Sequence, residues 1–391
     1  MNCTTLGIDL AKQVFQLHGV DERGHVVVQK RVTGAKFRET VAQLPACLIG
    51  MEACGSAQYW AREFQQLGHT VKLISPQFVK PYVKGNKSES RDAEAIGEAV
   101  SRPHMRFVPL KTVESQDIQA IHRMRSRLIK ERTALGNQIR GLLAERGIVI
   151  TQGMTRLRQQ LPTIVEDEAN ELTPLSREVM RELYEELVAV DARVARADAL
   201  VQRVFTQSAP CQKLAQVEGI GPVVATALVA AVGNAKEFAT GRHLAAWLGL
   251  VPRQHSTGGK ERLLGISKRG DRYLRTLLIH GARATVHHAR RKTDARSRWS
   301  LSLEKRRGKN IAAVAIANKN ARIAWALLTW DAEYRKAAER AEGRWPGTDA
   351  LAEKERLADS CEGENGVMAA AVRPACSEPA LRHGPSRSRF C

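Results

Sequence analysis

The first hundred residues alternate apolar strand patterns with amphipathic helix patterns, and this alternation constrains the fold more than any other feature. Alternating or continuous apolar runs predict strands, whereas apolar residues spaced three to four apart predict helices. The predicted strands cover residues 4–9, 14–20, 25–32, 47–52 and 71–74, and the predicted helices cover residues 36–43, 56–67 and 90–100. Three strands in succession, followed by alternating helices and strands, predict an α/β domain built on one sheet.

Acidic residues stand at the ends of two predicted strands and at the start of a later helix. Asp9 and Glu52 each end an apolar strand, while Glu89 and Asp92 lie three positions apart and share one helix face. Each has a plain structural reading, as a turn residue, the partner of a nearby lysine, or an acid favoured by the helix dipole. Acids converging from separate elements are also what two-metal phosphodiester chemistry needs, and Mg²⁺ prefers such carboxylate oxygens. The element order is that of a ribonuclease-H-like sheet, which fits this chemistry.

Two long helices with apolar residues at heptad spacing are predicted next. The heptad positions are Ile121, Leu128, Leu135 and Leu142 in the first helix, and Met180, Leu187, Val194 and Val201, alternating with Leu183, Val190, Ala197 and Val204, in the second. This spacing predicts a coiled-coil hairpin or a dimer seam, with an ordinary buried bundle helix as the alternative. Residues 151–174 between them show less regular patterning, and we expect a connection there.

Residues 211–330 have the pattern of a separate helical region. Gly219 and Gly221 bound a turn typical of a helix-hairpin-helix, whose exposed backbone N–H groups can bind phosphate; a tight turn without a ligand is the alternative. After about Trp345 the periodicity vanishes, and the composition predicts a disordered tail. We therefore expect an acidic catalytic domain over residues 1–108, a coiled-coil segment over 109–208, a helical domain over 209–335 and the tail over 336–391.

The net charge of +20, from 61 Lys and Arg against 41 Asp and Glu, favours a nucleic-acid partner. Each cation that neutralises a phosphate releases condensed counterions, which drives binding to a polyanion. No run approaches a membrane span and no signal-peptide pattern occurs, so we expect no membrane association. The seven cysteines are scattered and form no CxxC pair, which predicts a reducing, cytoplasmic setting and no zinc site.

Four stretches of the chain resemble the insertion-sequence transposases with a RuvC-like acidic domain, the serine-assisted DEDD recombinases associated with a bridge RNA. The stretches read GIDLAKQVF, GMEACGSAQYW, KSESRDAEAIGEA and GLVPRQHSTGGKERLLGISKRGDRYLRTLLIHGARA, and the resemblance spans about residues 4–330. It implies magnesium ligands at Asp9, Glu52 and Asp92, and at Glu89, where the family usually has Asp. It also implies DNA and a guide RNA as partners, a dimer or tetramer, and a covalent protein–DNA intermediate.

The proline and the paired glycines of residues 252–260 predict a loop. The resemblance assigns a role to this loop. The nucleophile falls at Ser256 or Thr257; Ser256 is favoured because a primary hydroxyl is less hindered. His255 is a candidate for assisting proton transfer. Five cations are expected to contact DNA phosphates: Lys260, Arg262, Lys268, Arg269 and Arg272. The backbone at Gly219 and Gly221 is expected to contact phosphate as well.

Two other functions fit the same residues. The chain could be a nuclease that hydrolyses DNA with the acids alone, in which case the loop only binds. It could also be a nucleic-acid-binding protein without catalysis, in which case an ordinary polar turn replaces the nucleophilic loop. Substitution of the acids and of the hydroxyl residues separates the three functions.

Overall fold

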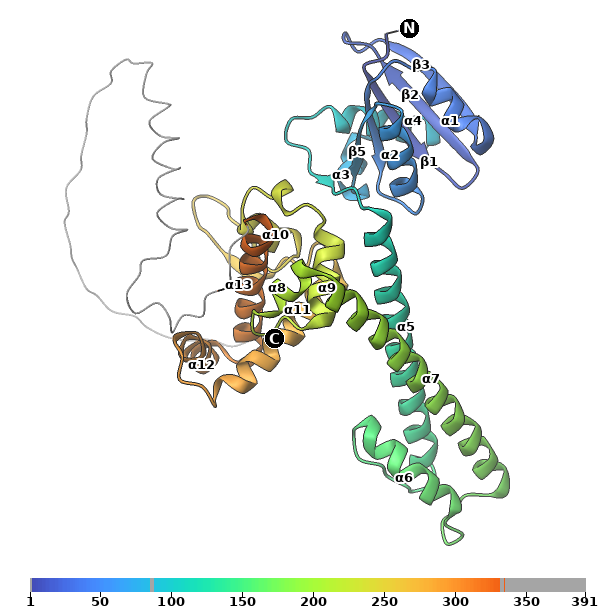
Figure 1. Ribbon diagram of the computed structural model, residues 1–391, viewed down its shortest axis with the longest axis vertical. Coiled ribbons are helices and arrows are strands. Elements are labelled where there is room, and N and C mark those ends of the chain that lie inside the picture. The colour runs from blue at the N-terminus through green and yellow to red at the C-terminus, as the bar shows by residue number, and fades with distance from the viewer. Residues whose placement is uncertain (1, 85–87, 331–333, 335–391) are drawn as a thin grey trace, which may run out of the picture. The chain divides into compact units, whose positions relative to one another are not determined.

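The computed structural model describes residues 2–84, 88–330 and 334 (Figure 1). The predicted tail over residues 336–391 lies outside the described residues, as do Cys361, Cys376 and Cys391. The first third of the chain forms a six-stranded mixed sheet flanked by helices, and the rest is predominantly helical. The predicted combination of an α/β N-terminal domain with a helical C-terminal region is therefore confirmed.

The sheet has the strand order β3-β2-β1-β4-β5-β6. Strands β1, β2 and β3 pair antiparallel, β1, β4 and β5 pair parallel, and β6 closes the sheet antiparallel to β5. The bounds are β1 (Thr5–Leu10), β2 (Val14–Val20), β3 (Val26–Thr33), β4 (Leu48–Glu52), β5 (Thr70–Ile74) and β6 (Phe107–Val108). All five predicted strands are present within one residue at either end, and the two-residue β6 was not predicted.

Helices cover both faces of this sheet. On one face, α1 (Gly34–Ala42) and α2 (Ala57–Gln66) bury Phe37 and Phe64 against Leu6, Ile8 and Ile49. On the other face, α4 (Glu89–Val100) packs across β1, β2 and β4. The short α3 (Pro76–Val79) and the 3₁₀ helix η1 (Lys80–Tyr82) precede α4. Strands β1 and β4 therefore carry buried residues on both faces, whereas β2 alternates and buries only one face.

The two long helices α5 (Val113–Ala144) and α7 (Pro174–Gln207) pack against each other (Figure 1). Their heptad residues fill the contact: Leu128 packs with Val190 and Val194, and Leu135 lies in one cluster with Met180 and Leu187. The two helices therefore pack within one chain, as both a hairpin and an ordinary bundle helix would. The expected irregular connection was wrong, because residues 151–174 contain the helix α6 (Met154–Glu166), which buries Leu157, Leu161 and Val165.

The C-terminal region is a helical cluster around one apolar core. Its elements are α8 (Ala209–Ala215), α9 (Pro222–Val232), the 3₁₀ helix η2 (Ala235–Glu237), α10 (Gly241–Trp247), the hairpin strands β7 (Pro252–Gln254) and β8 (Leu263–Ile266), α11 (Arg272–Ala289), α12 (Ala295–Arg307) and α13 (Lys309–Thr329). The hairpin replaces part of the expected loop. By length and composition α13 could span a membrane. Its Ala313, Ile316 and Ala317 are fully buried, so we interpret it as a core helix.

Candidate active site

Asp9 and Glu52 lie at the carboxyl ends of two neighbouring parallel strands. The register of β1 and β4 pairs Ile8 with Met51, so Asp9 and Glu52 are the next residues along their strands. Two residues before each acid stands a glycine, and Gly7 and Gly50 are themselves register partners. Because residues two apart on a strand share a face, both acids belong to the face on which the two glycines lie.

The two glycines let α4 approach this face closely. A Cβ atom on Gly7 would lie 2.1 Å from the carbonyl oxygen of Ala93, and one on Gly50 would lie 2.8 Å from Cβ of Val100. Distances below 3.0 Å are essentially never seen for a real Cβ, so neither position admits a side chain without a shift of the helix. The close approach brings the first turn of α4, which carries Glu89 and Asp92, to the acids of β1 and β4.

The charges of the four acids interact. Burial raises the pKa of Asp9 to about 6, and the negative charges of Asp92, Glu52 and Glu89 add to the rise in that order. A carboxyl group surrounded by like charges is harder to ionise, since each neighbour disfavours its charged form. The four acids that the sequence predicted come from three different elements and are therefore near enough for the charges of three of them to act on Asp9.

The side chains of the four acids do not converge as a ready metal cage. Within the described ranges, no three acidic, histidine or cysteine side chains lie close enough together to hold one metal ion. Their chemistry nevertheless fits a hard divalent cation, because all the donors are carboxylate oxygens and their mutual repulsion is what such a cation offsets. Asp9, Glu52, Glu89 and Asp92 could hold such a cation if their side chains moved closer together.

Two further acids, Glu94 and Glu98, lie on α4, and Glu98 is already paired with cations. It forms ion pairs with Arg102 at 2.6 Å and with Lys84 at 3.2 Å. The hydrogen bond from Arg102 and then that from Lys84 hold its pKa below the usual value. Two cations hold the Glu98 carboxylate near the carboxyl end of α4. Glu98 is therefore not part of the acidic set, the name used below for Asp9, Glu52, Glu89 and Asp92.

Sequence reasoning missed one polar residue at this site. Gln16 of β2 is the register partner of Asp9, and its Nε2 donates a hydrogen bond to Oε2 of Glu89 at 3.3 Å. The two bonded residues are 73 positions apart in the sequence. The Gly-x-acid pattern shared by β1 and β4 was visible in the sequence, whereas this contact was not.

The predicted hydroxyl nucleophiles lie on the exposed β7–β8 hairpin, in a sheet separate from that of the acids. Thr257 and Lys260 form a bridge across the tip, and Gly258 and Gly259 between them have φ values of 56° and 76°. Two successive residues with positive φ are typical of a tight two-residue hairpin turn. Ser256 Oγ accepts a hydrogen bond from Nε2 of Gln254 at 2.9 Å, so its observed side-chain partner is Gln254 and not His255.

The base of this hairpin is fixed by Arg275. Its buried guanidinium Nη1 donates to the carbonyl oxygens of Leu248 at 3.2 Å and Arg269 at 3.1 Å, which precede and follow the hairpin. The chain crosses itself closely here, since a Cβ on Gly270 would lie 1.8 Å from the carbonyl oxygen of Trp247. Lys268 next to the crossing has a positive φ of 54°, which is uncommon outside glycine. We conclude that the hairpin is held at its stem and exposed at its tip.

The predicted DNA-binding cations surround this hairpin on the surface. All five are exposed: Lys260, Arg262, Lys268, Arg269 and Arg272. The predicted glycine-bounded turn lies between α8 and α9, with Gly219 at φ 87° and Gly221 as the residue before α9. Gly219 lines a surface hollow of about 480 Å³ with Thr285, His288, Arg291 and Lys292, among others. In this hollow Lys292 Nζ pairs with Glu218 at 2.5 Å.

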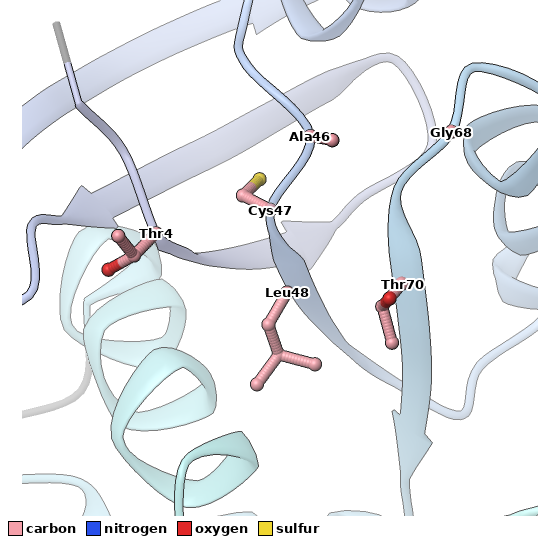
Figure 2. A pocket seen from close by; sticks show the side chains of 6 residues that line it. All are labelled: Thr4, Ala46, Cys47, Leu48, Gly68 and Thr70. Atoms are coloured by element: carbon pink, nitrogen blue, oxygen red, sulfur yellow. The ribbon is translucent and has the colours of Figure 1, made fainter.

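A second hollow, of about 360 Å³, lies at the amino ends of β1, β4 and β5 (Figure 2). It is lined by Thr4, Ala46, Cys47, Leu48, Gly68 and Thr70. This is the end of the parallel strands opposite to Asp9 and Glu52, and none of the lining residues is acidic. The hollow is therefore separate from the acidic set.

Comparisons with known proteins match most of the chain. A family model described as the IS116/IS110/IS902 transposase family matches residues 211–298, and a DEDD transposase model of the IS110 type matches residues 6–147. A probable family 20 transposase of Pseudomonas aeruginosa is 56% identical over 336 residues, covering 86% of this chain and 99% of that protein. The transposase of insertion element IS1111A from Coxiella burnetii is 50% identical over 85% of this chain and 92% of that protein. The transposase of IS1328 from Yersinia enterocolitica is 38% identical over 86% and 99%.

Proposed function

Because this chain belongs to the IS116/IS110/IS902 family of insertion-sequence transposases, we propose that it cuts and rejoins DNA through a magnesium–carboxylate centre and a hydroxyl nucleophile. The chain is a DNA transposase, and membership of a DEDD family implies a divalent metal. The finer assignments are Mg²⁺ at Asp9, Glu52, Glu89 and Asp92, and Ser256 as nucleophile with Thr257 as the alternative.

The observation that carries the proposal is geometric: Asp9 and Glu52 end neighbouring parallel strands, and the close approach of α4 at Gly7 and Gly50 brings the helix turn with Glu89 and Asp92 to them. The strand order, with three antiparallel strands followed by two parallel ones, supports a ribonuclease-H-like or RuvC-like catalytic domain over residues 1–108. Residues 109–208 are then a coiled-coil segment and residues 209–335 the serine-containing, DNA-binding domain.

In the proposed strand exchange, the four acids bind the metal and the hydroxyl residue of the β7–β8 hairpin attacks the DNA. A bound Mg²⁺ would supply positive charge that offsets the negative charge developing on the reacting phosphate, and Asp9, Glu52, Glu89 and Asp92 would hold it. Ser256 Oγ forms a bond to phosphorus as the bond from phosphorus to one DNA strand breaks, and the serine proton passes to the departing hydroxyl. A second DNA hydroxyl reverses the step, so the ester conserves the bond and no net hydrolysis occurs.

Exposed cations hold the DNA for this reaction. Lys260, Arg262 and Lys268 flank the hydroxyl residues, and each can neutralise one phosphate. Arg269 and Arg272 extend this surface, and the turn at Gly219 and Gly221 supplies a further phosphate contact beside the hollow that contains Arg291. Element ends, target DNA and a guide RNA are the proposed nucleic-acid partners, in a dimer or tetramer acting in the cytoplasm.

The decisive experiment incubates full-length protein with element-end DNA, flanking RNA and Mg²⁺, and detects a protein–DNA adduct on a denaturing gel. Ser256→Ala should abolish the adduct, and Asp9→Asn should abolish both adduct and cleavage. Glu94→Gln, an acid of α4 outside the proposed set, is the matched control and should leave both intact.

Three results would overturn parts of the proposal. Strand transfer that survives Ser256→Ala combined with Thr257→Val would refute the covalent step and leave a nuclease. Cleavage that survives Asp9→Asn would refute the acidic centre. A DNA affinity that does not fall as salt rises would refute the cationic surface, since several phosphate contacts require a steep salt dependence.

A further inference from the structure

Two glutamines tie the first turn of α4 to the antiparallel half of the sheet. Gln16 of β2 donates from Nε2 to Glu89 Oε2 at 3.3 Å, and Gln29 of β3 donates from Nε2 to Ser90 Oγ at 3.2 Å. The contacts are alike in donor and length, and they reach neighbouring residues of one helical turn. The two hydrogen bonds differ in their acceptor: Gln16 binds Glu89, which is one of the four acids, whereas Gln29 binds Ser90, which is not.

The position of Gln16 relates its contact to Asp9. Gln16 and Asp9 are directly opposite each other in the antiparallel pair of β1 and β2. Side chains at opposite positions share a face, with Cβ atoms about 4.5–5.5 Å apart. The amide that binds the Glu89 carboxylate therefore stands beside Asp9, on the face that α4 covers.

The chemistry of an amide suits this place. Glu89 is exposed and has three rotatable side-chain bonds, so it would otherwise sample many positions. A lysine or arginine could also hold it, but would form an ion pair that competes with a bound cation. The neutral amide of Gln16 orients the carboxylate and leaves its charge to a metal, as outer residues around metal ligands commonly do.

We propose that Gln16 is a positioning residue of the acidic centre, which holds the Glu89 carboxylate beside Asp9 so that both can bind the same divalent cation. This inference rests on the proposed function, because it requires that Asp9 and Glu89 are metal ligands. It assigns no step of the reaction to Gln16.

The test is binding of Mg²⁺ and of Mn²⁺ to the full-length protein, measured by isothermal titration calorimetry without DNA. Gln16→Leu should weaken metal affinity by roughly tenfold, the lower end of the effect of removing a residue that orients a metal ligand. Gln29→Leu is the matched control and should bind metal as the unmodified protein does. In a Glu89→Gln background, Gln16→Leu should cause no further loss, because the contact it removes no longer orients a ligand.

The outcomes separate this inference from the proposed function. If Asp9→Asn binds metal as tightly as the unmodified protein, the acidic centre itself is refuted. If Asp9→Asn weakens binding while Gln16→Leu does not, or while Gln29→Leu weakens it equally, the role of Gln16 is refuted and the centre survives. Should Gln16→Leu prove unstable, Gln16→Thr, which suits a half-buried strand position and also lacks the amide, gives the same reading.

Discussion

Replacing Gly7 with alanine should separate α4 from the sheet and displace two of the four acids. The added Cβ would lie 2.1 Å from the carbonyl oxygen of Ala93 and 2.5 Å from the backbone nitrogen of Gly97. Ordinary contact begins at 3.4 Å, so the helix must retreat by about 1.3 Å. Both neighbours are backbone atoms that cannot rotate away. We therefore expect a loss of about 3 kcal/mol of stability, the upper end of the usual overpacking cost.

The effect on catalysis should exceed the effect on folding. Glu89 and Asp92 move with α4, whereas Asp9 and Glu52 stay with their strands, and a displacement of about 1 Å can slow a positioned reaction by about 100-fold. The unfolding free energy is measured by urea denaturation, and the rate by strand transfer at saturating Mg²⁺ under conditions where the variant remains folded.

Gly97→Ala tests the same interface without the clash. Its Cβ would lie 3.4 Å from the nitrogen and 3.5 Å from the Cα of Gly7, which is ordinary contact. Alanine is also the better helix former by about 1 kcal/mol, so this variant should be as stable as the unmodified protein or more so. The reasoning fails if Gly7→Ala retains both stability and rate, or if the two variants behave alike.

Three further predictions concern other parts of the molecule. His122 is buried, with ring nitrogens 3.0 Å from the hydroxyls of Tyr273 and Thr226, and burial, followed by the charge of Arg125, lowers its pKa to about 4. Since the unfolded chain takes up this proton first, stability should fall by up to about 3 kcal/mol as pH drops from 6.5 to 4, and urea denaturation of His122→Gln should show less of this loss. Arg275→Met should release the stem of the hairpin, which limited trypsin digestion would detect as faster cleavage between β7 and β8; an unchanged cleavage pattern would contradict the role given to Arg275. Asp9→Asn should raise the melting temperature at pH 8. The pKa of Asp9 in the folded protein is raised to about 6, so its ionised carboxylate destabilises the fold above that pH, and the neutral amide removes this cost. Added Mg²⁺ should raise the melting temperature of the unmodified protein only.

The sequence predicted the elements with strong periodicity and missed those without it. Strands β1, β2, β4 and β5 were predictable because each is a continuous or alternating apolar run that the fold buries, whereas β3 was predicted although it buries only Val28. Helix α6 was missed because it contains Pro162 and buries only three residues, so its pattern is short and interrupted. Strands β7 and β8 were missed because their residues are almost all exposed, which leaves no alternation to read.

The acidic set was predictable in its members but not in its assembly. Asp9 and Glu52 stood out as charges at the ends of apolar strands, and Glu89 and Asp92 as a pair at a helix start. The hydrogen bond from Gln16, and the register that pairs Gly7 with Gly50, depend on which strands are neighbours. That information lies in tertiary packing, since a lone glutamine on a strand has no distinguishing pattern.

The glycine pair and the acidic set make sense as one arrangement. Like charges on β1, β4 and α4 repel one another, and the repulsion acts to move the helix away from the strands. The helix resists because its approach at Gly7 and Gly50 allows Ile96 and Val100 to pack against the sheet without intervening side chains. A larger residue at either glycine would move α4 away from the sheet, and the repulsion between the acids favours the same displacement. A glycine two residues before an acid in both strands therefore permits the close approach that brings the first turn of α4 near Asp9 and Glu52.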